Sequence, residues 1–154
     1  MKLKKSAGIL LYKKVNMRLL VMLVHPGGPF WESKGSGHWS IPKGEFNDEE
    51  NAFDAALREF EEETGTRIDG DFIELDPVKL KSGKIVYAWA LEKDIDAAAV
   101  ESNTFEIEWP PKSGILKSFP EIDKASWFTV EEALEKINVA MRGFILQLVG
   151  KVEP

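Results

Sequence analysis

Apolar residues along this chain gather in short blocks that are separated by polar or glycine-containing turns. Such blocks, bounded by turn residues, are typical of β-strands. Asn16 lies at the tip of the turn between the first two apolar blocks. Ser82 and Gly83 separate two later blocks, and Pro110 and Pro111 follow the end of a further block. The pattern predicts strands over residues 7–12, 18–25, 39–42, 71–81, 84–92, 104–109 and 124–129.

The segment of residues 48–64 has a different period, that of an amphipathic helix. Four apolar residues recur at helical spacing and form one face for the core: Phe53, Ala56, Leu57 and Phe60. Asn47 or Asp48 is expected to begin this helix, and Gly65 to end it.

Two further helices are expected near the C-terminus. Thr129 is followed three residues later by Glu132, which is the spacing of a capping box and predicts a helix after Thr129. A last helix is expected over residues 139–149. Strands mixed with a few helices in 154 residues indicate an α/β or α+β fold in a single domain over residues 1–154.

The composition excludes several kinds of chemistry. The chain has no cysteine, which excludes a disulfide framework, a thiolate zinc site and a cysteine nucleophile. The two histidines, His25 and His38, are too few for a multi-histidine metal site. No apolar run is long enough for a membrane span or a signal peptide, so we expect a cytoplasmic protein without a membrane partner.

The net charge of −6 is concentrated in one stretch. Residues 45–64 contain nine acidic residues and one basic residue, whereas the rest of the chain has nineteen basic and seventeen acidic residues. This balance argues against a protein that binds nucleic acid through a basic surface. The acidic stretch is either a solvated helix face or a site that something cationic neutralises.

Three of these acidic residues fall within one turn of the predicted helix. Glu59, Glu62 and Glu63 occupy positions i, i+3 and i+4, where like charges repel one another. Carboxylate oxygens held together in this way suit a hard divalent cation such as Mg²⁺ or Mn²⁺. A solvated acidic face is the alternative interpretation.

The wider pattern around these glutamates resembles the Nudix box, G-x5-E-x7-R-E-U-x-E-E-x-G-U, in which U is a bulky apolar residue. In residues 44–66 the chain departs from this pattern only at Thr66, where the family prefers an aliphatic residue, and it matches at Gly44, Glu50, Arg58, Glu59, Phe60, Glu62, Glu63 and Gly65. The segments WSIPKG before the box and WFTVEEAL after it are also similar to Nudix domains. The whole order of motifs looks like a bacterial subgroup of MutT-like proteins, the predicted nucleoside-triphosphate pyrophosphohydrolases.

This resemblance implies the Nudix fold, a mixed β-sheet sandwiched between α-helices, and hydrolysis of a diphosphate linked to another group X with Mg²⁺ or Mn²⁺. It implies that the metal ligands are Glu59, Glu62 and Glu63, which with Arg58 form the catalytic set. In the same way it assigns a metal-ligand role to the backbone carbonyl of Lys43, and supporting roles in the box to Gly44, Glu50 and Gly65. An ion pair with Asp54 is an additional or alternative role for Arg58. The residues leave open whether Glu59 or Glu63 orients the water.

Nudix enzymes often recruit another carboxylate from a later loop. Glu121 is the candidate, because it precedes Trp127 by six residues, as an acidic residue does in several relatives. Glu106 and Glu108 are the rivals, although they alternate with apolar residues in a way that favours the solvent-facing side of a strand.

Candidate substrate contacts lie outside the box. The Lys43 ammonium could touch phosphate, Trp31 in the glycine-rich loop could contact a base, and Tyr87 could stack on one. For Tyr87 core packing is the alternative. The expected ligand is a nucleotide or another diphosphate-containing small molecule, and the resemblance allows a homodimer. The rival function is a non-catalytic, nucleotide-sensing Nudix-like module, which usually lacks box carboxylates that this chain retains.

Overall fold

The computed structural model describes residues 4–29 and 37–153. Its main sheet has six strands: β1 (Lys5–Val15), β2 (Arg18–Pro26), β3 (Lys43–Phe46), β4 (Ile73–Lys79), β5 (Ile85–Glu92) and β8 (Ile122–Thr129). The order is β4-β5-β1-β2-β8, and β3 pairs with the first part of β1. Because β1 runs parallel to β5 but antiparallel to β2 and β3, the sheet is mixed, as predicted.

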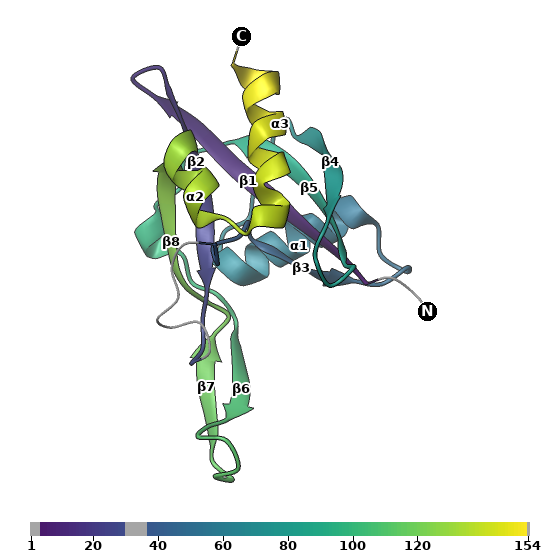
Figure 1. The fold of residues 1–154 in the computed structure, drawn as a ribbon, viewed down its shortest axis with the longest axis vertical. Helices are drawn as coiled ribbons and strands as arrows, with labels where there is room; N and C mark the ends of the chain where they lie inside the picture. Colours follow the sequence, from purple (N-terminus) through teal and green to yellow (C-terminus); the bar gives the residue numbers. More distant parts are fainter. Residues whose placement is uncertain (1–3, 30–36, 154) are drawn as a thin grey trace.

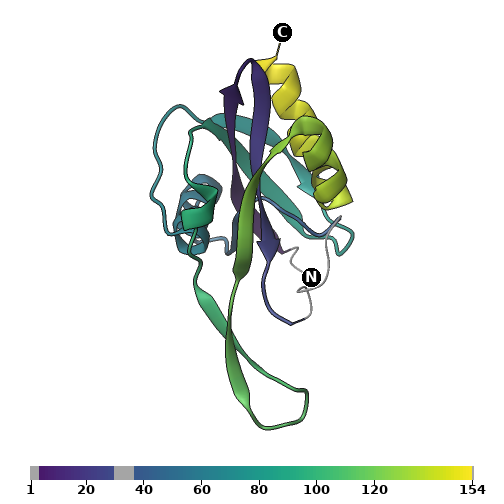
Figure 2. The same cartoon turned by 90° about the vertical axis from the view of Figure 1, so that its left-hand side faces the viewer.

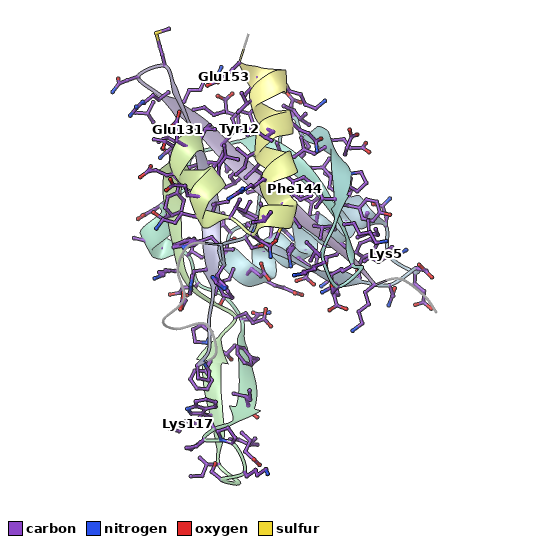
Figure 3. The ribbon with its side chains drawn as sticks, viewed as in Figure 1. Lys5, Tyr12, Lys117, Glu131, Phe144 and Glu153 are labelled. Atoms are coloured by element: carbon purple, nitrogen blue, oxygen red, sulfur yellow. The ribbon has the colours of Figure 1, made fainter. Side chains whose placement is uncertain are left out.

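Helices cover both faces of this sheet. Figure 2 shows α1 (Ala52–Thr64) on one side, and α2 (Val130–Lys136) with α3 (Arg142–Val152) on the other. Each face has its own apolar cluster: Ile9 and Met22 pack with Phe60 under α1. Tyr12 and Phe144, which are labelled in Figure 3, belong to the cluster under α2 and α3. The structure therefore confirms the expected α/β/α sandwich.

A two-stranded hairpin projects from the body of the molecule (Figure 1). It consists of β6 (Thr104–Glu108) and β7 (Leu116–Pro120), which pair antiparallel and form a separate sheet. We call residues 104–120 the arm. The sequence pattern predicts β6, but β7 was not expected because Lys117 and Ser118 interrupt its apolar residues.

Several predicted boundaries differ from those in the structure. The acidic helix begins at Ala52 rather than near Asn47, because Asn47 forms a turn with Glu50 and the side chain of Asn51 caps the helix instead. Gly65 ends this helix in the left-handed conformation, with φ of 76°, as predicted.

Two other segments are also corrected. In the predicted strand over residues 39–42, only Trp39 and Ser40 form isolated bridges, and the strand follows at β3. The last helix begins three residues later than expected, because a short 3₁₀ helix, η2 (Val139–Met141), precedes it. The Thr129 capping box is present. A second 3₁₀ helix, η1 (Ala97–Ala99), follows β5. Within the described residues, no helix is long and apolar enough to cross a membrane.

Candidate active site

Helix α1 separates its apolar and acidic residues because of their spacing. Ala55, Ala56 and Phe60 are buried against the sheet. The glutamates at positions 59, 62 and 63 lie along the border between this buried face and solvent. Glu59 is the most enclosed of them, with 9% of its surface exposed, so at least one carboxylate is largely withdrawn from water.

Arg58 binds three glutamates at once. Its Nε and Nη2 donate hydrogen bonds of 2.8 Å to the two carboxylate oxygens of Glu50. Its Nη1 donates to Glu59 Oε1 at 2.8 Å and more weakly to both oxygens of Glu62 at 3.3 Å. Asp54 is not among its partners in the described residues, so the structure does not contain the alternative ion pair with Asp54. Arg58 therefore orients the box carboxylates and offsets part of their charge.

Strand β3 brings the backbone at residues 43 and 44 against the helix. A Cβ added at Gly44 would lie 2.0 Å from Glu59 Cδ, so the Glu59 carboxylate keeps this position only because residue 44 is glycine. The neighbouring Lys43 N–H donates a 2.8 Å hydrogen bond to Glu63 Oε2. The pairing of β3 with β1, which places Gly44 opposite Ala7, fixes both contacts.

Glu121 lies near these glutamates although it is distant in sequence. It occupies the single position between β7 and β8, and it lines the same pocket as Lys43 and Glu63. Glu106 and Glu108 lie on the exposed side of β6 and do not line that pocket. The placement thus favours Glu121 over its rivals as the additional carboxylate.

The electrostatics show that negative charge is crowded here. Burial raises the pKa of Glu63 to about 8 although the N–H and the charge of Lys43 oppose this shift, and the negative charges of Glu59 and Glu121 add smaller contributions in the same direction as burial. Burial also raises the pKa of Glu59 and Glu121, and repulsion from Glu62 adds to both shifts. These carboxylates would be stabilised by a nearby cation.

The pocket beside the glutamates has a volume of about 350 Å³. Apart from the charged residues, its walls are largely apolar: Val24, Pro26, Trp39, Ile41, Leu80, Ile122 and Met141. His38, Ser40 and Asn138 add polar groups. A pocket that combines two carboxylates and a lysine with largely apolar walls suits a ligand with a polar reacting group and a less polar body.

The candidate substrate residues are placed differently from one another. Lys43 lines the pocket, and burial is the main cause that lowers the pKa of its ammonium group. Tyr87 lies on β5 with its ring 6.1 Å from that of Phe46, and it does not line the pocket. Trp31 lies outside the described residues.

The sequence did not predict that His25 and Asp123 pair with each other near the site. His25 is fully buried, and its Nδ1 lies 2.9 Å from Asp123 Oδ1. Asn138 and Met141, which line the pocket, were also not expected there. No local motif marks these residues, because the topology alone brings β2, β8 and η2 to one end of the sheet.

The carboxylate oxygens of Glu59, Glu62 and Glu63 are chemically suited to bind a hard divalent cation. In the described part of the chain no three acidic or histidine side chains already surround a point that could hold an ion. Arg58 and the Lys43 N–H engage the carboxylates of Glu59, Glu62 and Glu63 instead. Oxygen ligands with crowded negative charge nevertheless match what Mg²⁺ and Mn²⁺ prefer.

Comparison with known proteins agrees with this architecture. The family model described as the NUDIX domain matches residues 2–148. The chain belongs to the NUDIX family. This Nudix assignment confirms the expectation from the box of residues 44–66, and it supports the prediction of a MutT-like pyrophosphohydrolase that acts on acid anhydrides.

Solved structures similar to this Nudix chain share its fold. An Ap4A hydrolase of C. elegans in a binary complex has a TM-score of 0.63 at 20% identity, covering 96% of this chain and 99% of that one. The NUDIX domain of Shewanella oneidensis NrtR, complexed with ADP ribose, has a TM-score of 0.61 at 17% identity, covering 98% and 86%. The MutT protein of Methanosarcina mazei has a TM-score of 0.60 at 20% identity, covering 98% and 96%.

One curated protein is similar in sequence. An octanoyltransferase of Myxococcus xanthus is 32% identical over 101 residues, which cover 66% of this chain. The match covers 25% of that protein, so the chain spans about a quarter of the length of this relative.

Proposed function

We propose that this protein is a divalent-cation-dependent Nudix hydrolase that cleaves a phosphoanhydride bond in a nucleoside diphosphate linked to X. In the proposed reaction, water attacks phosphorus. The observation that carries the proposal is that Glu63 and Glu121 line one pocket together with Lys43, while Glu59 and Glu62 lie near enough to raise the pKa of these carboxylates. Family membership supports the same reaction class.

The carboxylates of Glu59, Glu62, Glu63 and Glu121, with the Lys43 carbonyl, would hold Mg²⁺ or Mn²⁺. Such an ion, when bound, neutralises phosphate charge and lowers the pKa of a coordinated water. Without it, an acidic pocket would repel the polyphosphate that it has to bind. Arg58 keeps Glu59 in a fixed orientation through its 2.8 Å hydrogen bond.

The water-orienting role is assigned to Glu63 rather than Glu59. One oxygen of each carboxylate is engaged, Glu59 Oε1 by the positively charged Arg58 and Glu63 Oε2 by the Lys43 N–H, but of the two glutamates Glu63 is the one that lines the pocket. Glu63 Oε1 therefore keeps its lone pairs for a water proton. A proton-accepting group has to lie within hydrogen-bond reach of the nucleophile, and Glu63 lines the pocket where substrate would enter.

The substrate is a small molecule that carries a diphosphate, with Lys43 contacting its phosphate and the apolar walls contacting X. Nucleoside triphosphates, dinucleoside polyphosphates and nucleotide sugars all meet this description. The names of the similar structures, an Ap4A hydrolase and a domain complexed with ADP ribose, are consistent with that range. The pocket has room for one nucleoside-sized group, so a second group would extend beyond it.

A panel of these compounds, assayed with Mg²⁺ or Mn²⁺ and with both products identified, tests the proposal. Reaction in ¹⁸O-labelled water would show which phosphorus is attacked. Glu62→Gln and Glu63→Gln should each reduce turnover at least about 100-fold, whereas Glu61→Gln, an exposed neighbour on the same helix, should not. Tight binding of a panel compound without any hydrolysis would favour the nucleotide-sensing alternative instead.

A further inference from the structure

Glu121 differs from the other three glutamates in how it is held. Among the described residues, no hydrogen bond or ion pair reaches its carboxylate, whereas Arg58 or the Lys43 N–H binds each of the others. Glu121 still lies near enough to raise the pKa of Glu59 and Glu63. Its position must therefore come from the backbone on either side of it.

Both peptide groups that flank Glu121 are fixed by hydrogen bonds. The Glu121 N–H donates to the carbonyl of Asn103 at 2.9 Å, and the Glu121 carbonyl accepts from the Gly27 N–H at 2.9 Å. The next N–H, that of Ile122, donates to Ser102 Oγ at 3.0 Å.

These bonds continue to the acidic helix. The Asn103 N–H donates to the carbonyl of Glu62 at 3.0 Å, and the Glu101 N–H donates to the carbonyl of Thr64 at 3.0 Å. The base of the arm is thus bonded to the last turn of α1, which carries Glu62 and Glu63. A continuous series of backbone bonds runs from Glu62 through Asn103 to Glu121.

Gly27 has a steric requirement as well. A Cβ added there would lie 2.1 Å from the Pro120 carbonyl oxygen, which immediately precedes Glu121. The pairing of β2 with β8 is irregular between His25 and Pro26, next to this contact. Such irregularities redirect side chains near active sites. Any side chain at position 27 would push the junction of the arm and the sheet away from α1.

We propose that Gly27 and Ser102 are positioning residues that hold Glu121 opposite Glu63, so that the base of the arm completes the cation site. This inference rests on the proposed function, because it assumes that these glutamates share a divalent cation. Gly27 acts through the backbone of residues 120 and 121, and Ser102 acts through the peptide between Glu121 and Ile122.

The test measures Mn²⁺ affinity directly, by electron paramagnetic resonance of the free ion, without substrate. Gly27→Ala and Ser102→Ala should each weaken Mn²⁺ binding about 10-fold, as the loss of outer partners of metal ligands typically does. Ser102→Thr, which keeps the hydroxyl, should restore most of the affinity. Gly150→Ala is the matched control, because nothing lies within 4 Å of a Cβ at that position.

A Glu121→Gln background separates positioning from general damage to the structure. If Gly27 and Ser102 act through Glu121, their substitutions should cause no further loss of Mn²⁺ affinity in that background. An equal loss in both backgrounds, or wild-type affinity in folded Gly27→Ala and Ser102→Ala proteins, would overturn the inference. Should Gly27→Ala fail to fold, Ser102→Ala and Ser102→Thr provide the same test, because their Mn²⁺ affinities can be compared in both backgrounds.

The two proposals fail in different ways. If Glu63→Gln weakens Mn²⁺ binding but Glu121→Gln does not, the cation site stands and the positioning inference is wrong. If neither Glu62→Gln nor Glu63→Gln changes Mn²⁺ binding, the proposed function itself is wrong.

Discussion

Arg58 donates two parallel hydrogen bonds of 2.8 Å to Glu50, eight residues earlier in the chain. Glu50 lies just before the helix, next to the capping residue Asn51, and so it holds the guanidinium from outside the cluster of Glu59, Glu62 and Glu63. The same guanidinium reaches Glu59 and Glu62 through Nη1 alone. If the proposed cation binds Glu59 and Glu62, Glu50 would therefore limit how strongly Arg58 competes with it for those two carboxylates.

Replacing Glu50 by Gln should weaken cation binding. Without the negative charge of the Glu50 carboxylate, Arg58 would turn more fully toward Glu59 and Glu62. These two carboxylates would then be less available to Mn²⁺. We expect about a 10-fold rise in the Mn²⁺ dissociation constant, measured by titration calorimetry. Asp54→Asn is the control, since Asp54 is an exposed acid in the same region that does not contact Arg58. Unchanged or tighter Mn²⁺ binding by Glu50→Gln would contradict this role.

Adding a single methyl group at Gly44 should disrupt the site. The new Cβ would overlap the Glu59 carboxylate, and either β3 or Glu59 would have to move. We expect Gly44→Ala to reduce kcat at least about 10-fold and to change the free energy of unfolding little, because the atoms that must move are the end of the Glu59 side chain. Turnover assays and urea denaturation measure the two effects. Wild-type kcat in this variant would show that the close approach is dispensable.

The periodic parts of the sequence predicted the fold well. The strands around Asn16 and around Gly83, the helix that Gly65 ends and the Thr129 capping box all follow from short-range patterns, and the structure contains each of them. The predicted start of α1 was wrong because two asparagines compete to cap it, and the sequence does not show that Asn47 forms a turn instead.

Residue spacing predicted the site only where its residues are neighbours in sequence, whereas Glu121 was predicted from the family resemblance. Glu59, Glu62 and Glu63 come together because a helix repeats every three to four residues. Gly27, Ser102 and Asp123 lie near Glu121 because strands from distant parts of the chain meet at one end of the sheet. The roles proposed for Gly27 and Ser102 depend on contacts with the backbone of residues 120–122, and such contacts leave no mark in residue type or spacing.

The Lys43 side chain should contribute to substrate binding more than to turnover. It lines the pocket, and its backbone N–H, which binds Glu63, survives any change of the side chain. We expect Lys43→Gln to raise KM about 10-fold with kcat largely kept, since one charge-assisted contact to phosphate would be lost. Lys81→Gln, an exposed lysine in the β4–β5 turn, is the control. A fall in kcat at unchanged KM would instead place Lys43 in the chemical step.

The raised pKa of Glu63 predicts how stability depends on pH without a metal ion. Its pKa is about 8 in the folded protein and near the ordinary glutamate value of 4.5 in the unfolded chain, so the folded state binds more protons between these values. Stability from this group is therefore present below about pH 4.5 and is lost as pH rises toward 8, by at most about 1.4 kcal/mol per pH unit. Glu63→Gln removes the titration, so its free energy of unfolding should fall less steeply than that of wild type over this range.

A bound cation should reverse the trend. Mn²⁺ or Mg²⁺ binds the ionised carboxylate, so the increase in Tm on adding the ion should be larger at pH 8 than at pH 6. Thermal unfolding with and without the ion at both pH values measures this difference. Glu61→Gln should behave like wild type, and Glu63→Gln should lose most of the pH dependence of the increase. An ion effect that is equal at both pH values in wild type would contradict Glu63 as a ligand whose ionisation is coupled to cation binding.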